Sequence, residues 1–207
     1  MTWVAPVLGV LAGVVGVVDT IPYIRDTVRG ATRPHRGTWG IWGVLGIVVC
    51  LSQRADGASW SLVMAAVQAV LTSLIFLLSI RHGEGGLRLT EVVMIALASA
   101  GVTGWVLADE PIVATACVVV ADLVGVTMMV PKTYRDPGSE TAATFALASL
   151  GGVLAAGAVG AVDLSLLLYP VYYCLANAAI LVLIHHRRGR APATGWARST
   201  SMASARR

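Results

Sequence analysis

Charged residues are scarce in this chain: they make up 13% of the sequence, whereas 57% of the residues are hydrophobic. A soluble domain carries roughly 25% charged residues. The composition therefore excludes an ordinary soluble domain and predicts an all-α membrane protein, because a helix satisfies its own backbone hydrogen bonds in lipid. The net charge of +4 is explained by the basic loops described below and implies no nucleic-acid partner.

Cysteine is also rare. Cys50, Cys117 and Cys174 each fall in an apolar segment, their number is odd, and no Cys-x-x-Cys pair occurs. We therefore expect buried, unreactive thiols. His185 and His186 have no recognisable third ligand, so neither a metal nor another cofactor is expected. No nucleophile–base set, phosphate loop or haem motif is recognisable, which argues against an enzyme.

The N-terminus lacks the basic segment of a signal peptide, so the first apolar run is interpreted as a retained helix. A membrane span needs about 20 mostly apolar residues. By this measure we expect seven transmembrane helices, over 3–24, 38–51, 59–80, 90–107, 111–130, 140–161 and 164–184. The basic tail over 187–207 is rich in Arg, Ala and Ser and is predicted to be disordered.

Basic residues gather in alternate loops. All of them except Arg54 lie after the first, third or fifth expected helix, or at the C-terminal end. Loops rich in Lys and Arg remain on the cytoplasmic side of a membrane. The pattern predicts a multi-pass protein of the cell membrane with its N-terminus outside and its C-terminus in the cytoplasm. The preference for Arg over Lys, with much Gly and Ala, suggests a bacterial inner membrane.

Two stretches of the chain resemble each other. Residues 22–26 read Pro-Tyr-Ile-Arg-Asp and residues 131–136 read Pro-Lys-Thr-Tyr-Arg-Asp, each after an apolar run. The two prolines are separated by 109 positions, and residues 38–39 match residues 144–145 after a three-residue adjustment. Such a repeat predicts two parallel three-helix bundles in a 3+1+3 arrangement. The expected divisions are a first repeat over 1–81, a linker helix over 82–110 and a second repeat over 111–186.

This 3+1+3 plan, with a proline near the end of the first and fifth helices, resembles the PQ-loop/SWEET superfamily of small-solute transporters. The resemblance covers residues 3–184 and implies parallel repeats related by an axis along the membrane normal. The diagnostic Pro-Gln dipeptide is absent, since Tyr23 follows Pro22 and Lys132 follows Pro131. The PnuC-type nicotinamide riboside carriers have a similar helix plan and remain an alternative.

Two amides lie near the centres of apolar helices, Gln68 in the third and Asn177 in the seventh. Trp60 precedes Gln68, and Tyr169 and Tyr173 precede Asn177, at spacings that place each set on one helix face. We favour a pocket in which these residues bind a neutral polar solute. In the alternative, the amides only join helices, which contributes about 0.6–2 kcal/mol. The flanking residues Tyr172 and Cys174 are expected to pack.

Asp19 and Asp122 are the acids deepest in apolar sequence. Ionising an acid at membrane depth costs several kcal/mol, so such a residue is a candidate for proton coupling. Some proton-driven carriers of the resembled superfamily use acids near this motif, and the resemblance implies the same role here. For Asp19 the alternative is a structural contact with Arg25 or with a helix N-terminus.

Pro22 and Pro131 each remove a backbone donor and bend their helices. The resemblance implies that these prolines act as hinges for alternating access. In the alternative, each proline marks a fixed kink or a helix end.

The function expected from these features is uniport or proton-coupled transport of a small polar solute, such as a sugar, a nucleoside or an amino-acid-like compound. Its other partner is the lipid bilayer, and a homo-oligomer is compatible with it. Three alternatives stay open: a vitamin or nucleoside carrier of the PnuC type, a non-transporting membrane receptor of the same fold, and a structural protein whose basic tail holds anionic lipid.

Overall fold

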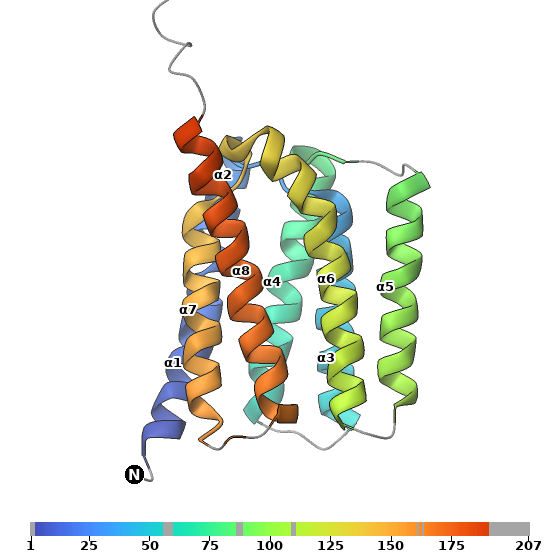
Figure 1. The fold of residues 1–207 in the computed structure, drawn as a ribbon, viewed down its shortest axis with the longest axis vertical. Helices are drawn as coiled ribbons and strands as arrows, with labels where there is room; N and C mark the ends of the chain where they lie inside the picture. Colours follow the sequence, from blue (N-terminus) through green and yellow to red (C-terminus); the bar gives the residue numbers. More distant parts are fainter. Residues whose placement is uncertain are drawn as a thin grey trace, which may run out of the picture.

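The computed structural model describes residues 3–55, 60–85, 89–108, 111–160, 162 and 164–190. These residues form helices that run side by side in one bundle (Figure 1), and no strand occurs among them. The elements in chain order are α1 (Val4–Val18), α2 (Thr20–Val28), α3 (Arg36–Ala55), α4 (Trp60–His82), α5 (Leu89–Leu107), α6 (Pro111–Arg135), the 3-10 turn η1 (Pro137–Ser139), α7 (Ala142–Ala158) and α8 (Leu164–Arg190).

Each expected helical range falls on a helix, but several expected ends were wrong. α3 extends beyond both ends of 38–51, and α6 continues through Pro131 instead of ending at 130. α8 continues to Arg190, so the first residues of the tail are helical rather than disordered. Arg187 donates to the Tyr134 carbonyl in the last turn of α6, and Arg188 donates to carbonyls of the segment between α6 and α7, which holds the last turns of α8 in place. The rest of the tail lies outside the described residues.

α1 and α2 form one rod with a break at Asp19. Pro22 has no amide hydrogen, so the carbonyl of Val18 loses the donor that a regular helix would supply. Asp19 keeps helical backbone angles (φ −60°, ψ −30°), which explains why the rod bends without ending. α2 then stops at Gly30, whose positive φ of 74° suits a residue without a side chain.

Three described helical stretches are long and apolar enough to cross a membrane: Val4–Val28, Ala116–Arg135 and Leu167–Gly189. Two shorter apolar stretches are Ala69–His82 and Ala142–Ala158. Many large apolar side chains of these helices are exposed on the bundle surface, for example Val10, Leu123 and Val182. An apolar surface of this kind is what lipid-facing positions require, and the composition agrees with it. We therefore describe the chain as a membrane protein.

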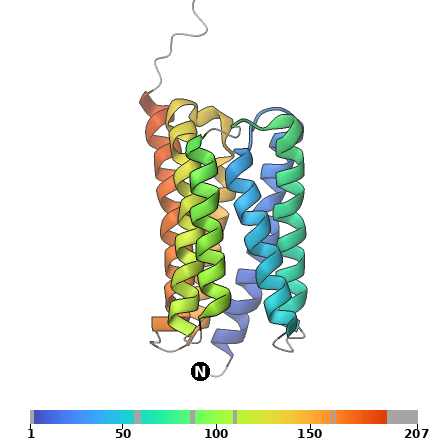
Figure 2. The ribbon, with the colours of Figure 1, turned by 90° about the vertical axis from the view of Figure 1, so that its right-hand side faces the viewer.

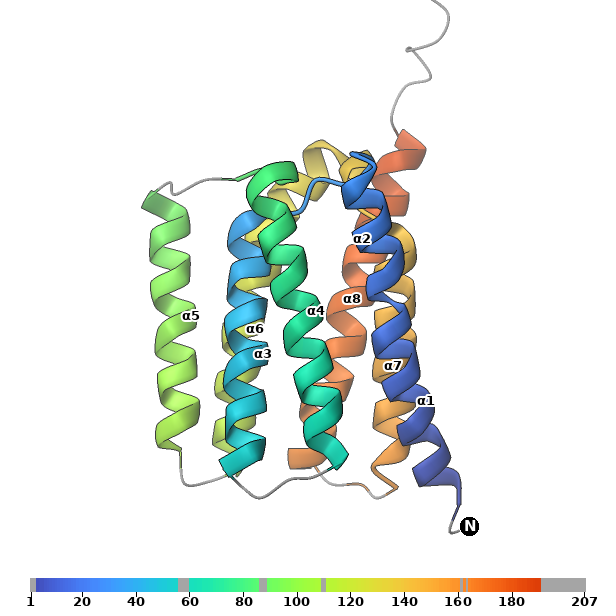
Figure 3. The ribbon, with the colours of Figure 1, turned by 180° about the vertical axis from the view of Figure 1, so that it is seen from behind.

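The helices pack in neighbouring pairs. α3 packs along α4, α5 along α6, and α7 along α8, while α1 packs along α7. α6 also contacts α8 and α3. α5 lies at one edge of the bundle beside α6 (Figure 3). Figure 2 shows α3 and α4 on one side and α5, α6 and α8 on the other.

The main core cluster lies toward one end of the bundle. Tyr23, Trp39, Met129 and Phe145 are buried there together. The Tyr23 ring lies 4.7 Å from the Trp39 ring and 6.4 Å from the Phe145 ring, measured between centroids. Aromatic rings at these separations contribute about 0.5–1.5 kcal/mol beyond their buried area. This cluster joins α2, α3, α6 and α7 at a single level.

We call that end of the bundle the interlocked end, and define it by residues 29–35 between α2 and α3 and residues 136–141 between α6 and α7. The two segments touch: the Arg33 amide donates to the Ser139 carbonyl at 2.9 Å. Arg36 fixes the start of α3 to the end of α4 by donating to the carbonyls of Ser79, Gly83 and Gly85.

Candidate functional site

A short hydrogen bond inside the described spans joins α6 to α8. The Tyr172 hydroxyl donates to Asp122 Oδ2 at 2.7 Å. Tyr172 packs against Tyr169, as expected, and its hydroxyl in addition reaches an acid of another helix. Asp122 therefore contacts α8 through this bond. Its role in proton coupling stays a prediction.

The tyrosines of α8 form a continuous aromatic surface. The rings of Tyr169 and Tyr173 are stacked with centroids 6.0 Å apart, and the ring of Tyr172 lies 6.4 Å from that of Tyr169. Asp122 of α6 thus lies at the edge of this aromatic surface, where it is bonded to Tyr172.

Asp19 is buried at the break between α1 and α2, with 3% of its surface exposed. Its Oδ1 accepts a hydrogen bond from the Thr20 hydroxyl at 2.9 Å, and its backbone carbonyl accepts one from Thr144 at 2.8 Å. The alternative in which Asp19 pairs with Arg25 is wrong, because Arg25 pairs with Asp26 at 2.9 Å. No described cation lies within salt-bridge distance of Asp19, so hydroxyl and backbone groups surround this carboxyl.

Asn177 is buried in α8, one turn after Tyr173. Its Nδ2 donates to the Tyr173 carbonyl of its own helix at 2.8 Å. The amide is therefore satisfied within α8, and its Oδ1 is the group that remains for a neighbour or a solute. The side chains of Trp60 and Gln68, both in α4, lie outside the described residues, so their expected pairing with Asn177 stays a prediction.

The two prolines occupy different places in their helices. Pro22 lies in the first turn of α2, just after the break at Asp19. Pro131 lies inside α6, which continues for another turn to Arg135. Each proline is followed by a residue whose side chain enters the same cluster at the interlocked end, namely Tyr23 and Lys132. Their role as hinges stays a prediction.

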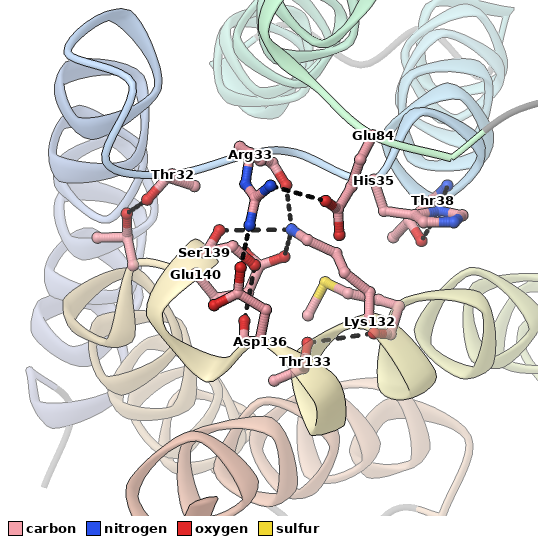
Figure 4. A network of polar contacts seen from close by, with 12 residues as sticks. Thr32, Arg33, His35, Thr38, Glu84, Lys132, Thr133, Asp136, Ser139 and Glu140 are labelled. Atoms are coloured by element: carbon pink, nitrogen blue, oxygen red, sulfur yellow. Dashed lines mark hydrogen bonds and ion pairs between the residues drawn. The ribbon is translucent and has the colours of Figure 1, made fainter. Parts of the chain in front are cut away.

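A buried ion pair lies at the interlocked end (Figure 4). Lys132 pairs with Glu140, and only 5% and 0% of the two side chains are exposed. The other carboxylate oxygen of Glu140 accepts the hydrogen bond of the Tyr23 hydroxyl at 2.9 Å. The Tyr23 oxygen in turn accepts the indole N–H of Trp39 at 2.9 Å. In this series of bonds, which runs from the Trp39 indole through Tyr23 and Glu140 to the Lys132 ammonium, each of these polar groups has a partner. A buried charge requires such partners.

Burial raises the pKa of the Glu140 carboxyl above its ordinary value, while the nearby Lys132 ammonium and the Tyr23 hydroxyl act in the opposite direction. The backbone of Glu140 is held as well, because its carbonyl accepts a hydrogen bond from Arg188 of α8 at 2.8 Å. Glu140 is thus fixed by α6 and α8 on one side and by Tyr23 of α2 on the other.

The two loops at this end are joined by further bonds around the ion pair. Lys132 also donates to the Arg33 carbonyl, and Arg33 forms an ion pair with Asp136 at the exposed rim (Figure 4). The hydroxyls of Thr32 and Thr141 share a hydrogen bond of 2.6 Å, and Thr141 donates to Asp26 at 3.1 Å. The polar contacts therefore extend from the buried core to the surface.

The sequence analysis missed the cluster of Tyr23, Trp39, Lys132 and Glu140. Each member had an ordinary explanation when taken alone, such as a basic loop residue or an acid before a helix. The available signal was that both Tyr23 and Lys132 follow a proline in the repeated stretch. A second missed residue is Trp42 of α3, whose buried Nε1 has no described hydrogen-bond partner and lies beside Gly125 of α6.

Among the described residues, no three His, Cys, Asp or Glu side chains come together in a way that could hold a metal ion. No protein-family model, no curated protein and no solved structure matches this chain to a significant degree. Its function must therefore follow from the geometry of its own residues.

Proposed function

We propose that this protein is a seven-span membrane transporter that moves a small polar solute, coupled to protons, by alternating exposure of a central site. In this proposal α1–α2, α3 and α4 form a first triplet, α6, α7 and α8 form a second triplet, and α5 links them. The observation that carries the proposal is that Asp122 of the second triplet, without a described cationic partner, accepts the hydroxyl of Tyr172 beside the stacked rings of Tyr169 and Tyr173.

The pattern of helix contacts supports two triplets related by a two-fold axis. Within the triplets, α3 packs along α4 and α7 along α8. Between the triplets, the first helix of one contacts the second helix of the other in both directions: α1 packs along α7, and α6 contacts α3. A two-fold axis along the membrane normal generates reciprocal contacts of this kind.

Two hydrogen bonds between the triplets support the same relation. The Thr38 hydroxyl of α3 donates to the Gly125 carbonyl of α6 at 2.8 Å, and the Thr144 hydroxyl of α7 donates to the Asp19 carbonyl at 2.8 Å. Thr38 and Thr144 are 106 positions apart, and so are Asp19 and Gly125. The packing thus favours an offset of 106 for the first helix of each triplet instead of the 109 that separates the prolines.

With this offset, the two acids lie one helical turn apart when the equivalent helices are aligned. Asp122 then corresponds to Gly16 of α1, and Asp19 corresponds to Gly125 of α6. Each acid therefore has a glycine at the equivalent position of the other triplet. In this proposal the solute contacts the Asp122 carboxyl and the aromatic surface of Tyr169, Tyr172 and Tyr173, and Asp19 is a second group that can carry a proton.

The orientation follows from the interlocked end. Exposed basic residues of several helices gather there: Arg25, Arg29, Arg81, Arg135 and Arg188. Because positively charged loops remain in the cytoplasm, we place the interlocked end on the cytoplasmic side and the start of α1 outside. The site with Asp19 and Asp122 then lies within the membrane.

The test is uptake of a panel of sugars, nucleosides and amino acids into vesicles that contain the purified protein, with and without a pH gradient. We expect the gradient to drive uptake of at least one class, and Asp122→Asn to abolish the effect of the gradient, because an amide cannot carry the proton. Asn177→Ala is expected to weaken solute binding instead. Asp109→Asn, which makes the same change at an acid outside the expected helices, is the matched control and should keep the wild-type response.

Uptake of no compound in the panel would contradict the proposed function. An unchanged gradient effect in Asp122→Asn would remove Asp122 from the proposed coupling site.

A further inference from the structure

The polar bonds between the two triplets are concentrated at the interlocked end. Tyr23 of α2 donates to Glu140, Lys132 of α6 donates to the Arg33 carbonyl, and the Arg33 amide donates to the Ser139 carbonyl. The hydroxyls of Thr32 and Thr141 add another bond. Because these bonds connect opposite triplets, the triplets cannot separate at this end while the bonds persist.

The buried charges are distributed differently from the buried hydrogen bonds. Lys132 and Glu140 both belong to the second triplet, and Arg188 of the same triplet holds the Glu140 backbone. Tyr23 and its donor Trp39 both belong to the first triplet. A separation of the triplets would therefore leave the ion pair whole and would break the bond between Tyr23 and Glu140.

We propose that Tyr23 and the Lys132–Glu140 pair form a latch that closes the interlocked end, and that the latch opens between Tyr23 and Glu140 with the ion pair intact. Pulling apart a buried ion pair leaves a charge without compensation, which is costly. Breaking a hydrogen bond from a neutral hydroxyl costs far less, because water can replace each partner. The latch therefore stabilises the closed end without making its opening prohibitive.

Opening can be measured with a single buried thiol. Thr27 of α2 is fully buried and its hydroxyl has no described hydrogen-bond partner, so Thr27→Cys removes no bond. With the three native cysteines replaced by alanine, a water-soluble maleimide reaches Cys at position 27 only when this end opens. The reaction rate then reports the open fraction.

Tyr23→Phe keeps the ring in the core and removes the hydroxyl. We expect labelling at position 27 to accelerate about tenfold or more, because a hydrogen bond to an ionised group is lost. Tyr134→Phe makes the same chemical change at an exposed residue of the same end and is expected to leave the rate unchanged. Trp39→Phe weakens the same cluster within the first triplet and is expected to have a smaller effect than Tyr23→Phe.

A parallel set of variants that keeps native Cys174 as the only thiol separates opening from unfolding. Cys174 packs against Gly152 between α7 and α8, so its labelling should not change if only the interlocked end opens. If Tyr23→Phe accelerates both thiols, the double variant Lys132→Met/Glu140→Met replaces it, because it removes the acceptor of the Tyr23 hydroxyl without leaving a buried charge. Equal labelling at position 27 in Tyr23→Phe and Tyr134→Phe would overturn the latch, as would acceleration of both thiols in the double variant.

The latch proposal rests on the two triplets of the proposed function, but the labelling assay contains no solute. Labelling can therefore contradict the latch while uptake is observed. Equally, uptake can be absent while the labelling rates follow the expected order.

Discussion

The two ends of the bundle are held together in different ways. At the interlocked end, the contact between α1–α2, α3 and the α6–α7 region includes buried hydrogen bonds and the Lys132–Glu140 pair. At the opposite end, among the described residues, α1 meets α7 through small apolar groups: Gly9 faces Ala158, and Gly157 faces Leu8. One interface requires directed polar partners, and the other requires only close approach.

The difference indicates which end resists separation. Hydrogen bonds and ion pairs are lost over a short displacement, whereas apolar helix faces can slide or tilt with little change in contact. A bundle that rocks would therefore keep α1 against α7 and would have to break bonds only at the interlocked end. Substitutions at the interlocked end and substitutions between α1 and α7 should therefore differ in their effect on stability.

Lys132→Met should have the largest effect on stability. The substitution keeps the length of the side chain but leaves Glu140 buried without its cation, which costs about 3–5 kcal/mol. Thermal unfolding in detergent, followed by circular dichroism, measures this loss. Lys132→Met combined with Glu140→Met removes both charges and should recover much of the lost stability.

The destabilisation in Lys132→Met should depend on pH. Burial raises the pKa of Glu140 in the folded protein, and removing Lys132 raises it further. The folded state then binds a proton more tightly than the unfolded chain, so stability increases as pH falls through the folded pKa and is lost as pH rises. A melting temperature of Lys132→Met that does not rise at lower pH would contradict the assignment of the unpaired charge to Glu140.

Gly152→Ala should have the next largest effect. A Cβ atom at position 152 would lie 2.7–2.9 Å from the backbone and Cβ of Cys174 in α8, so α7 and α8 would have to move apart. Overpacking of this kind costs about 1–3 kcal/mol. Gly9→Ala is the matched change between α1 and α7, where the new Cβ would lie 3.8 Å from Ala158. It should leave the melting temperature unchanged or raise it, since Ala is the better helix former.

Thr38→Val and Thr144→Val should have smaller effects. Each conserves the side-chain shape and removes a buried hydroxyl bond to the facing helix, worth about 1 kcal/mol. Thr38→Val should cost somewhat more, because the Thr38 hydroxyl also contacts His35 Nδ1 at 3.2 Å. The double variant should show additive losses, because the two bonds share no partner. Melting temperatures of the two single variants and the double variant provide the test. A loss in the double variant far from the sum of the two single losses would contradict the independence of these bonds.

The helical composition of the chain could be predicted because apolar runs of about 20 residues have few alternatives in lipid. The helix ends could not be predicted as well. α8 continues to Arg190 because Arg187 and Arg188 find carbonyl partners on a segment about 50 positions earlier in the sequence. α6 continues through Pro131 because the residues after it, Lys132 and Thr133, are buried by neighbouring elements.

The candidate site was predicted in part. Asp122 was identified from its depth in apolar sequence, and the structure shows that its carboxyl accepts the Tyr172 hydroxyl of α8. Tyr172 was assigned to packing, because one helix alone gives no sign that its hydroxyl reaches an acid on another. Glu140 was only the first residue of an expected helix, since its partners Tyr23 and Lys132 lie on other helices.

The apolar helices of this chain and the concentration of basic residues in alternate loops follow from local properties, namely the length and hydropathy of each run. Which helices are neighbours, and which polar groups share a partner, depends on the tertiary structure. Tyr23 and Glu140 are separated by 117 positions in the chain and by 2.9 Å in space. A bond between such distant residues depends on the packing of every helix between them, and no local pattern encodes it.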